Sequence, residues 1–182
     1  MQCTSYKTKN PVIQIKTAFG EIDIELFEQQ APKTCAAILK NIELGIYERC
    51  SFYRVLNQDN QPSNATKSEL IQGGIWKTAP QKANNLDFIP HESTQQTGLK
   101  HMNGTVSLAR REPGTAKTEF FICMSEQPGL DHGGENMPDG EGYAAFGKVI
   151  KGMAVVKKIA TQNESDEYFD PPVPIINIIR KQ

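Results

Sequence analysis

The chain has 182 residues and a formal net charge of -1 at pH 7. This length suits one globular domain with a full hydrophobic core. Its 20 Lys and Arg residues are matched by 21 Asp and Glu residues, so there is no basic surplus of the kind that binds nucleic acid or an anionic membrane. We therefore expect neutral partners, and neither nucleic acid nor a membrane among them.

No stretch reaches the roughly 20 apolar residues that cross a bilayer, and the first residues, MQCTSYKTKNP, lack the apolar run of a signal peptide. We therefore expect the chain as it stands to be cytoplasmic. A cysteine so near the start is also what a trimmed lipoprotein would show. The alternative is a periplasmic protein or a lipoprotein, if a leader was removed before these residues.

No cofactor is indicated. The four cysteines have no CxxC spacing, which predicts neither a zinc site nor a redox pair. The three histidines stand in different loop contexts, and neither HExxH, GxSxG nor a P-loop motif is present. Hydrolase and nucleotide-triphosphatase functions lose their main support, and we expect neither a metal nor a nucleotide.

The folded part of the chain opens on two β-rich runs, 12–17 and 21–27, whose short linker predicts a hairpin. After Pro32, a helix of about three turns follows, with Thr34 as its predicted cap and Gly45 just past its end. Its apolar residues lie largely on one face.

Most of the remaining chain consists of short strands separated by Gly- and Pro-rich loops. We predict six further strands, at 51–56, 69–72, 105–110, 119–124, 143–149 and 174–180. Helical spacing returns only after Gly152, and residues 77–103 show little periodicity. Eight short strands and two helices, without βαβ alternation, predict an all-β fold, either an antiparallel sandwich or a closed barrel. We assign residues 1–11 to an N-terminal extension and 12–182 to one domain.

Arg54 is a charged residue within an aromatic strand, SFYRVL. The blocks SFYRVL, LIQGG, GTVSLARREPGTAKTEFFI, LDHG and YAAFGKVIKGM, taken together, resemble the signature blocks of the cyclophilin family, in the same order over roughly residues 12–180. On this resemblance the chain is identified as a member of that family, similar to its bacterial members.

The resemblance implies a closed eight-stranded antiparallel barrel capped by two α-helices, with a groove on its outer surface. The implied activity is peptidyl-prolyl cis/trans isomerisation, which assists protein folding. Arg54 matches the family's catalytic arginine, and Gln72 matches the glutamine beside it. The implied substrate-binding residues are Leu70, Ala109, Arg110, Glu119, Phe121, Leu130 and Tyr143. The implied partners are proline-containing peptides and unfolded protein clients. Separately, we expect the protein to be a monomer.

Three positions depart from the family pattern. Glu69 stands where an aromatic residue is common, Glu119 where glutamine is usual, and Gly129 where Trp or Phe is frequent. A carboxylate accepts hydrogen bonds but cannot donate them. If the family geometry holds, Glu119 lies near Arg54 and pairs with its guanidinium, which would lower the pKa of Glu119.

Two other functions stay open. A proline-peptide binding module or chaperone with weak turnover would keep the groove, and the three departures favour it. A sugar- or lipid-binding barrel would need an apolar lumen with room for its ligand.

Overall fold

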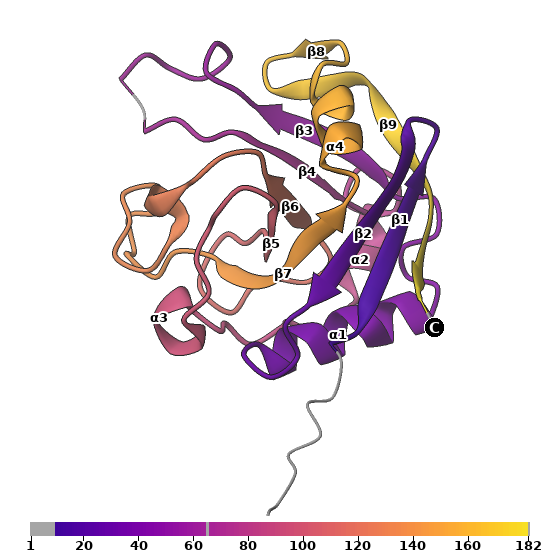
Figure 1. The fold of residues 1–182 in the computed structure, drawn as a ribbon, viewed down its shortest axis with the longest axis horizontal. Coiled ribbons are helices and arrows are strands. Elements are labelled where there is room, and N and C mark those ends of the chain that lie inside the picture. The colour runs from indigo at the N-terminus through magenta and orange to yellow at the C-terminus, as the bar shows by residue number, and fades with distance from the viewer. Residues whose placement is uncertain (1–9, 65, 182) are drawn as a thin grey trace, which may run out of the picture.

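The structure is a computed structural model that describes residues 10–64 and 66–181. Most of the predicted N-terminal extension, residues 1–9, lies outside the described residues. The predicted all-β fold is confirmed, because one antiparallel sheet in the order β1-β2-β7-β5-β6-β4-β3-β9-β8 closes on itself through pairing of β1 with β9 (Figure 1). The ring contains every strand except β8, so it is the eight-stranded barrel that the resemblance implied.

All eight predicted strands are present, as β1 Val12–Thr17, β2 Gly20–Leu26, β3 Ser51–Leu56, β4 Leu70–Gly74, β5 Thr105–Leu108, β6 Phe120–Cys123, β7 Ala144–Lys151 and β9 Tyr168–Arg180. The two-residue strand β8, Glu164–Ser165, was not predicted. The last strand begins earlier than predicted. Its first half contains prolines, which cannot donate a backbone hydrogen bond and therefore argue against a strand when only the sequence is known.

Apolar side chains fill the barrel. The alternation along β1 and β2 turns every second residue inward, and the largest buried side chains from all around the ring meet there. A cavity of about 10 Å³ among them has room for about one water molecule. The lumen cannot hold a sugar or a lipid, so the lumen-binding alternative is wrong.

The two predicted helices are α1 (Pro32–Glu43), packed on β7 and β9, and α4 (Met153–Ala160), packed on β2 and β4. They lie at opposite ends of the barrel (Figure 1). Two short helices were missed, α2 (Pro80–Asn84) and α3 (Thr94–Thr97). A helix of one turn shows no hydrophobic periodicity, so only its cap could have revealed it. Within the described residues, no helix is long and apolar enough to span a membrane.

The N-terminus of α1 is capped from outside the helix. Thr34 is not the N-cap residue as predicted, because the helix already begins at Pro32 and the N-cap position is Ala31. Instead, buried Glu92 accepts hydrogen bonds from the backbone N–H of Lys33 at 3.2 Å and from that of Thr34 at 2.8 Å. A carboxylate there satisfies N–H groups that have no partner within the helix and complements the helix dipole.

We expect Glu92→Ala to lower the free energy of unfolding by about 1 to 2 kcal/mol, because buried N–H groups and the Thr34 hydroxyl lose their acceptor. Urea unfolding measures this change. The exposed Glu126→Ala is the matched control and should shift the midpoint little. Equal effects of the two substitutions would contradict the capping role.

Candidate active site

Arg54 lies on β3, between β4 and β9. It faces Gln72 on β4 and Tyr168 on β9, next to a register shift between Phe52 and Arg54. Its side chain is 31% exposed, so the guanidinium is reachable from solvent while its stem packs on the barrel wall. The strand thus carries a single charge to the outside of a closed sheet.

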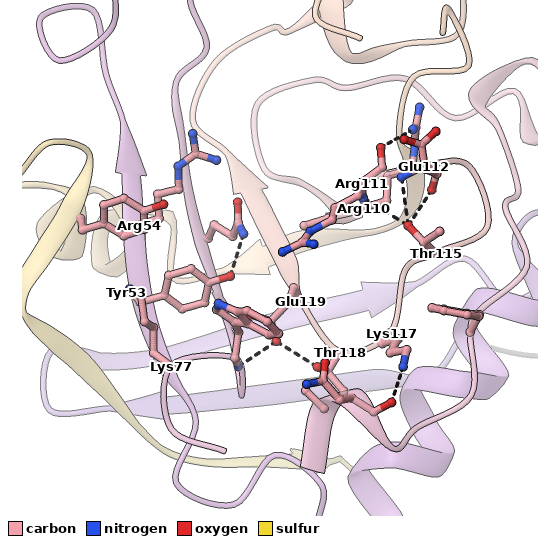
Figure 2. A pocket seen from close by; sticks show the side chains of 17 residues that line it. Tyr53, Arg54, Lys77, Arg110, Arg111, Glu112, Thr115, Lys117, Thr118 and Glu119 are labelled. Atoms are coloured by element: carbon pink, nitrogen blue, oxygen red, sulfur yellow. Dashed lines mark hydrogen bonds between the residues drawn. The ribbon is translucent and has the colours of Figure 1, made fainter. Parts of the chain in front are cut away.

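A pocket of about 580 Å³ opens on the barrel surface beside Arg54 (Figure 2). Five predicted site residues line it, namely Arg54, Gln72, Ala109, Arg110 and Glu119. Most of the other lining residues were not predicted from the sequence; they come from the segments around α2, from the loop between β5 and β6 and from the start of β9. Those segments carry no periodic pattern, so only their charged and aromatic content could have drawn attention to them.

The remaining predicted site residues gather in an apolar cluster of their own. Leu70, Phe121 and Leu130 are buried together, and Tyr143 and Ala109 pack against them. The rings of Phe121 and Tyr143 meet edge to face with centroids 5.2 Å apart. Ala109 touches both this cluster and the pocket, so the two halves of the predicted set adjoin at that residue. Phe120 points instead into the barrel core, as the alternation predicted.

A buried hydrogen-bond chain supports Phe121 from behind. The ring nitrogens of His101 lie 2.7 Å from Asp131 Oδ1 and 3.0 Å from Ser107 Oγ, and the imidazole stacks on Phe121. The order Ser-His-Asp resembles a hydrolase triad, but Ser107 is 0% exposed and no substrate can reach its hydroxyl. These hydrogen bonds therefore fix the His101 imidazole, which in turn orients the ring of Phe121 in the apolar cluster.

Arg110 is held by the loop before β7. Its guanidinium donates to both carboxylate oxygens of Asp139, at 2.7 and 2.8 Å, and to the carbonyl of Gly142. The hydrogen bond from Arg110 lowers the pKa of Asp139 to about 2. The guanidinium also lies over the Tyr143 ring, at 5.3 Å from its centroid. Arg110 therefore fixes the loop that presents Tyr143.

Glu119 does not pair with Arg54, so that prediction is wrong. Its Oε1 accepts hydrogen bonds from the backbone N–H of Ile75 at 2.9 Å and of Trp76 at 3.0 Å, just beyond the end of β4. Burial raises the pKa of Glu119, and the bonds from Tyr53, Thr118 and those amides offset it only in part. The Arg54 side chain points away from Glu119 (Figure 2). The carboxylate serves the turn after β4 and leaves the arginine to another partner.

Glu119→Gln should stabilise the protein at neutral pH. The folded-state pKa of Glu119 is raised above its ordinary value of 4.5, so ionisation of Glu119 destabilises the fold as the pH rises from that value through the raised one. A glutamine oxygen can still accept the two amide bonds without the charge. We expect a gain on the order of 1 kcal/mol at pH 7 that vanishes below about pH 4.5, by urea unfolding at both values. A loss at pH 7 would contradict this account.

Gln72 lies opposite Arg54 but binds a different side chain. Its Nε2 donates to the Tyr53 hydroxyl at 2.7 Å. Burial raises the pKa of Tyr53, so the phenol stays protonated and neutral. The amide of Gln72, which lines the pocket, is thereby oriented by the Tyr53 hydroxyl.

The partner of Arg54 is Glu167, which the sequence analysis missed. Glu167 Oε2 accepts from Arg54 Nε at 3.1 Å and from Nη2 at 2.6 Å. Glu167 belongs to the turn between β8 and β9, far from Arg54 in sequence, and no pattern in the sequence links the two.

Among residues 10–64 and 66–181, no group of three or more His, Cys, Asp or Glu side chains is arranged to hold a metal ion. The pocket is lined by guanidinium, ammonium, carboxylate, amide, phenol and aromatic side chains.

Comparison with known proteins agrees with this architecture. The profile of the family described as "Cyclophilin type peptidyl-prolyl cis-trans isomerase/CLD" matches residues 12–180. Peptidyl-prolyl cis-trans isomerase A of Dickeya dadantii is 32% identical, over 93% of this chain and 83% of its own length. Peptidyl-prolyl cis-trans isomerase B of Escherichia coli is 32% identical, over 81% of this chain and 83% of its own length.

A crystal structure of a Cryptosporidium parvum cyclophilin type peptidyl-prolyl cis-trans isomerase, obtained in the presence of the dipeptide Ala-Pro, has the same fold. It aligns with a TM-score of 0.72 at 23% identity, over 94% of this chain and 99% of that chain. Barrel and pocket together place the candidate site on the outer surface of the barrel. The chain belongs to the cyclophilin-type peptidyl-prolyl cis-trans isomerase family, and the predicted family and enzyme class are confirmed.

Proposed function

We propose that Arg54 is the catalytic residue of this isomerase, that Gln72 orients the bound peptide, and that the apolar cluster receives the proline ring. The observation that supports this most directly is that only one edge of the Arg54 guanidinium is hydrogen-bonded within the protein. Its Nε and Nη2 donate to Glu167, while Nη1 has no acceptor within the described part of the chain. A cation with free N–H groups thus lies at the edge of a pocket.

Isomerisation of an X-Pro bond needs a hydrogen-bond donor directed at the prolyl nitrogen and needs no nucleophile. Rotation about an X-Pro bond is slow because amide resonance sets a barrier of about 20 kcal/mol, so the uncatalysed step takes about 10 to 100 s. No covalent bond breaks. Twisting the amide pyramidalises the prolyl nitrogen, whose lone pair can then accept a hydrogen bond. An enzyme that binds this twisted state better than either planar isomer lowers the barrier.

An arginine suits this role because its charge is permanent and its donors have fixed directions. In our proposal, Arg54 Nη1 donates to the prolyl nitrogen as the amide twists. The rings and methyl groups of Phe121, Leu70 and Leu130 exclude water from the proline, which strengthens that hydrogen bond. The pocket lined by Gln72 holds the neighbouring residues of the peptide while one side of the bond rotates.

Arg54→Ala should lower kcat/KM by at least about a hundredfold, or roughly 3 kcal/mol of transition-state stabilisation, with the fold intact. A protease-coupled assay on an Ala-Pro peptide measures the rate, and circular dichroism checks the fold. Arg180→Ala, at the exposed end of β9, is the matched control and should keep full activity. If Arg54→Ala kept more than half of the wild-type rate, the proposed mechanism would be wrong.

The same assay separates an enzyme from a proline-peptide binding module with weak turnover. Glu119, one of the departures that favoured the binding module, is hydrogen-bonded to the amides of Ile75 and Trp76 and not to Arg54. It therefore leaves the guanidinium available, and this supports turnover over simple binding.

The rim of the pocket suggests which clients bind. Three exposed aromatic rings there each have a cation nearby, in the pairs Arg111–Trp76, Lys117–Phe88 and Lys77–Tyr168. None of these cations pairs with a carboxylate among the described residues. The expectation of neutral partners rested on the net charge of the whole chain, whereas these three cations make the rim itself positive. We infer that the clients are unfolded, proline-containing segments with acidic side chains near the proline. Action as a cytoplasmic monomer is part of the same proposal.

Peptides with Glu beside the Ala-Pro unit should therefore have a kcat/KM about threefold higher than the matching Lys peptides at low salt, and the difference should shrink at about 0.5 M salt. The double variant Arg111→Gln/Lys117→Gln should lose this preference. Lys16→Gln, on β1 and outside the pocket, should retain it. A preference for Lys peptides, or one insensitive to salt, would count against acidic clients.

A further inference from the structure

The turn between β8 and β9 holds two consecutive non-glycine residues in the left-handed backbone region. The φ angle is 51° at Asp166 and 72° at Glu167. Two-residue hairpin loops of this kind need positive φ at both central residues, and the second position strongly favours glycine. A glutamate is strained there. A strained glutamate at this position suggests that its side chain has a function that glycine could not supply.

The backbone of Glu167 is fastened to the strand that carries Arg54. Its carbonyl accepts a hydrogen bond from Val55 N–H at 2.8 Å, and its own N–H donates to Glu164 Oε2 at 3.0 Å. The next residue, Tyr168, lies opposite Arg54 in the register of β3 and β9. The turn therefore cannot slide along β3, and the Glu167 side chain starts from a fixed point beside the guanidinium.

The carboxylate engages only one edge of the guanidinium. A single oxygen, Glu167 Oε2, accepts from both Nε and Nη2 of Arg54, so the ion pair covers the edge nearest the stem. The two side chains are 31% and 23% exposed, which leaves the outer edge open to a ligand. Charge-assisted pairing of this kind fixes the plane of the guanidinium and the direction of its remaining N–H groups.

We propose that Glu167 is a positioning residue of the isomerase, which holds the Arg54 guanidinium so that Nη1 faces the twisting amide. This inference rests on the proposed role of Arg54. A free arginine side chain visits many rotamers, and each turnover would have to restrict them again. A carboxylate on the stem edge removes that freedom in advance without occupying the donors that the substrate needs.

A role of Glu167 in the hairpin alone and a role in positioning Arg54 lead to different expectations for the Glu167→Gly variant. If Glu167 served only the hairpin, glycine would relieve the strain, keep both backbone hydrogen bonds and leave the activity unchanged. If it serves Arg54, glycine should relieve the strained turn while the guanidinium loses its orientation. Stability and activity should then change in opposite directions, or activity should fall at unchanged stability.

The test compares Glu167→Gly with Asp166→Gly, its neighbour in the same turn, which also has positive φ but makes no contact with Arg54. We expect both variants to keep or raise the melting temperature, by up to about 4 °C. Only Glu167→Gly should lose activity, with kcat about tenfold lower and KM little changed. Glu167→Gln, which keeps an oxygen acceptor, should lose less. In an Arg54→Ala background, Glu167→Gly should cause no further loss.

Full activity of Glu167→Gly in an enzyme that depends on Arg54 would overturn this inference alone. Raised activity would also overturn it, because the carboxylate would then restrain Arg54 away from the substrate. Inactive wild-type protein, or an Arg54→Ala variant as active as wild type, would overturn the proposed role of Arg54 and this inference with it.

Discussion

The pairing of β1 with β9 is the constraint on which the rest of the structure depends, because it closes the sheet. A closed barrel of this size has a lumen that side chains fill, so a ligand can bind only outside. The strand order within the sheet places β3 between β4 and β9, so Arg54 has a neighbouring strand on either side. The pocket and the β8–β9 turn both lie against β3. Closure thus puts the site outside the barrel, strand order puts it beside β3, and a few side chains decide its chemistry.

The strands and the two longer helices could be predicted because alternation and helical spacing are local signals. The apolar cluster could also be predicted in outline, since Leu70, Phe121 and Leu130 lie within blocks that resemble the family. What could not be predicted depends on contacts distant in sequence. Glu167 reaches Arg54 only because β8 and β9 form a hairpin against β3, and its neighbours in sequence carry no sign of it.

The acidic residues also explain why the prediction for Glu119 was wrong. From sequence, a carboxylate near an arginine suggests an ion pair. In this fold, several carboxylates bind backbone amides instead, as Glu92 does at α1 and Glu119 does after β4. An unpartnered buried N–H is costly, and a carboxylate is a strong acceptor for it. Carboxylates that bind buried backbone N–H groups are therefore not available for ion pairs with Lys or Arg. Glu167 is the carboxylate that pairs with Arg54.

Gly129 shows how a departure from a family pattern can follow from packing and not from lost function. A Cβ atom at this position would lie 1.8 Å from Asn136 Oδ1. Asn136 donates to Ser68 Oγ at 2.9 Å, and its own N–H donates to the Gly129 carbonyl at 3.0 Å. It thereby ties the long loop before β4 to the loop that carries Leu130. A large aromatic side chain at position 129 would displace this bridge, so glycine at position 129 is needed for the contact between that loop and residues 57–69 before β4.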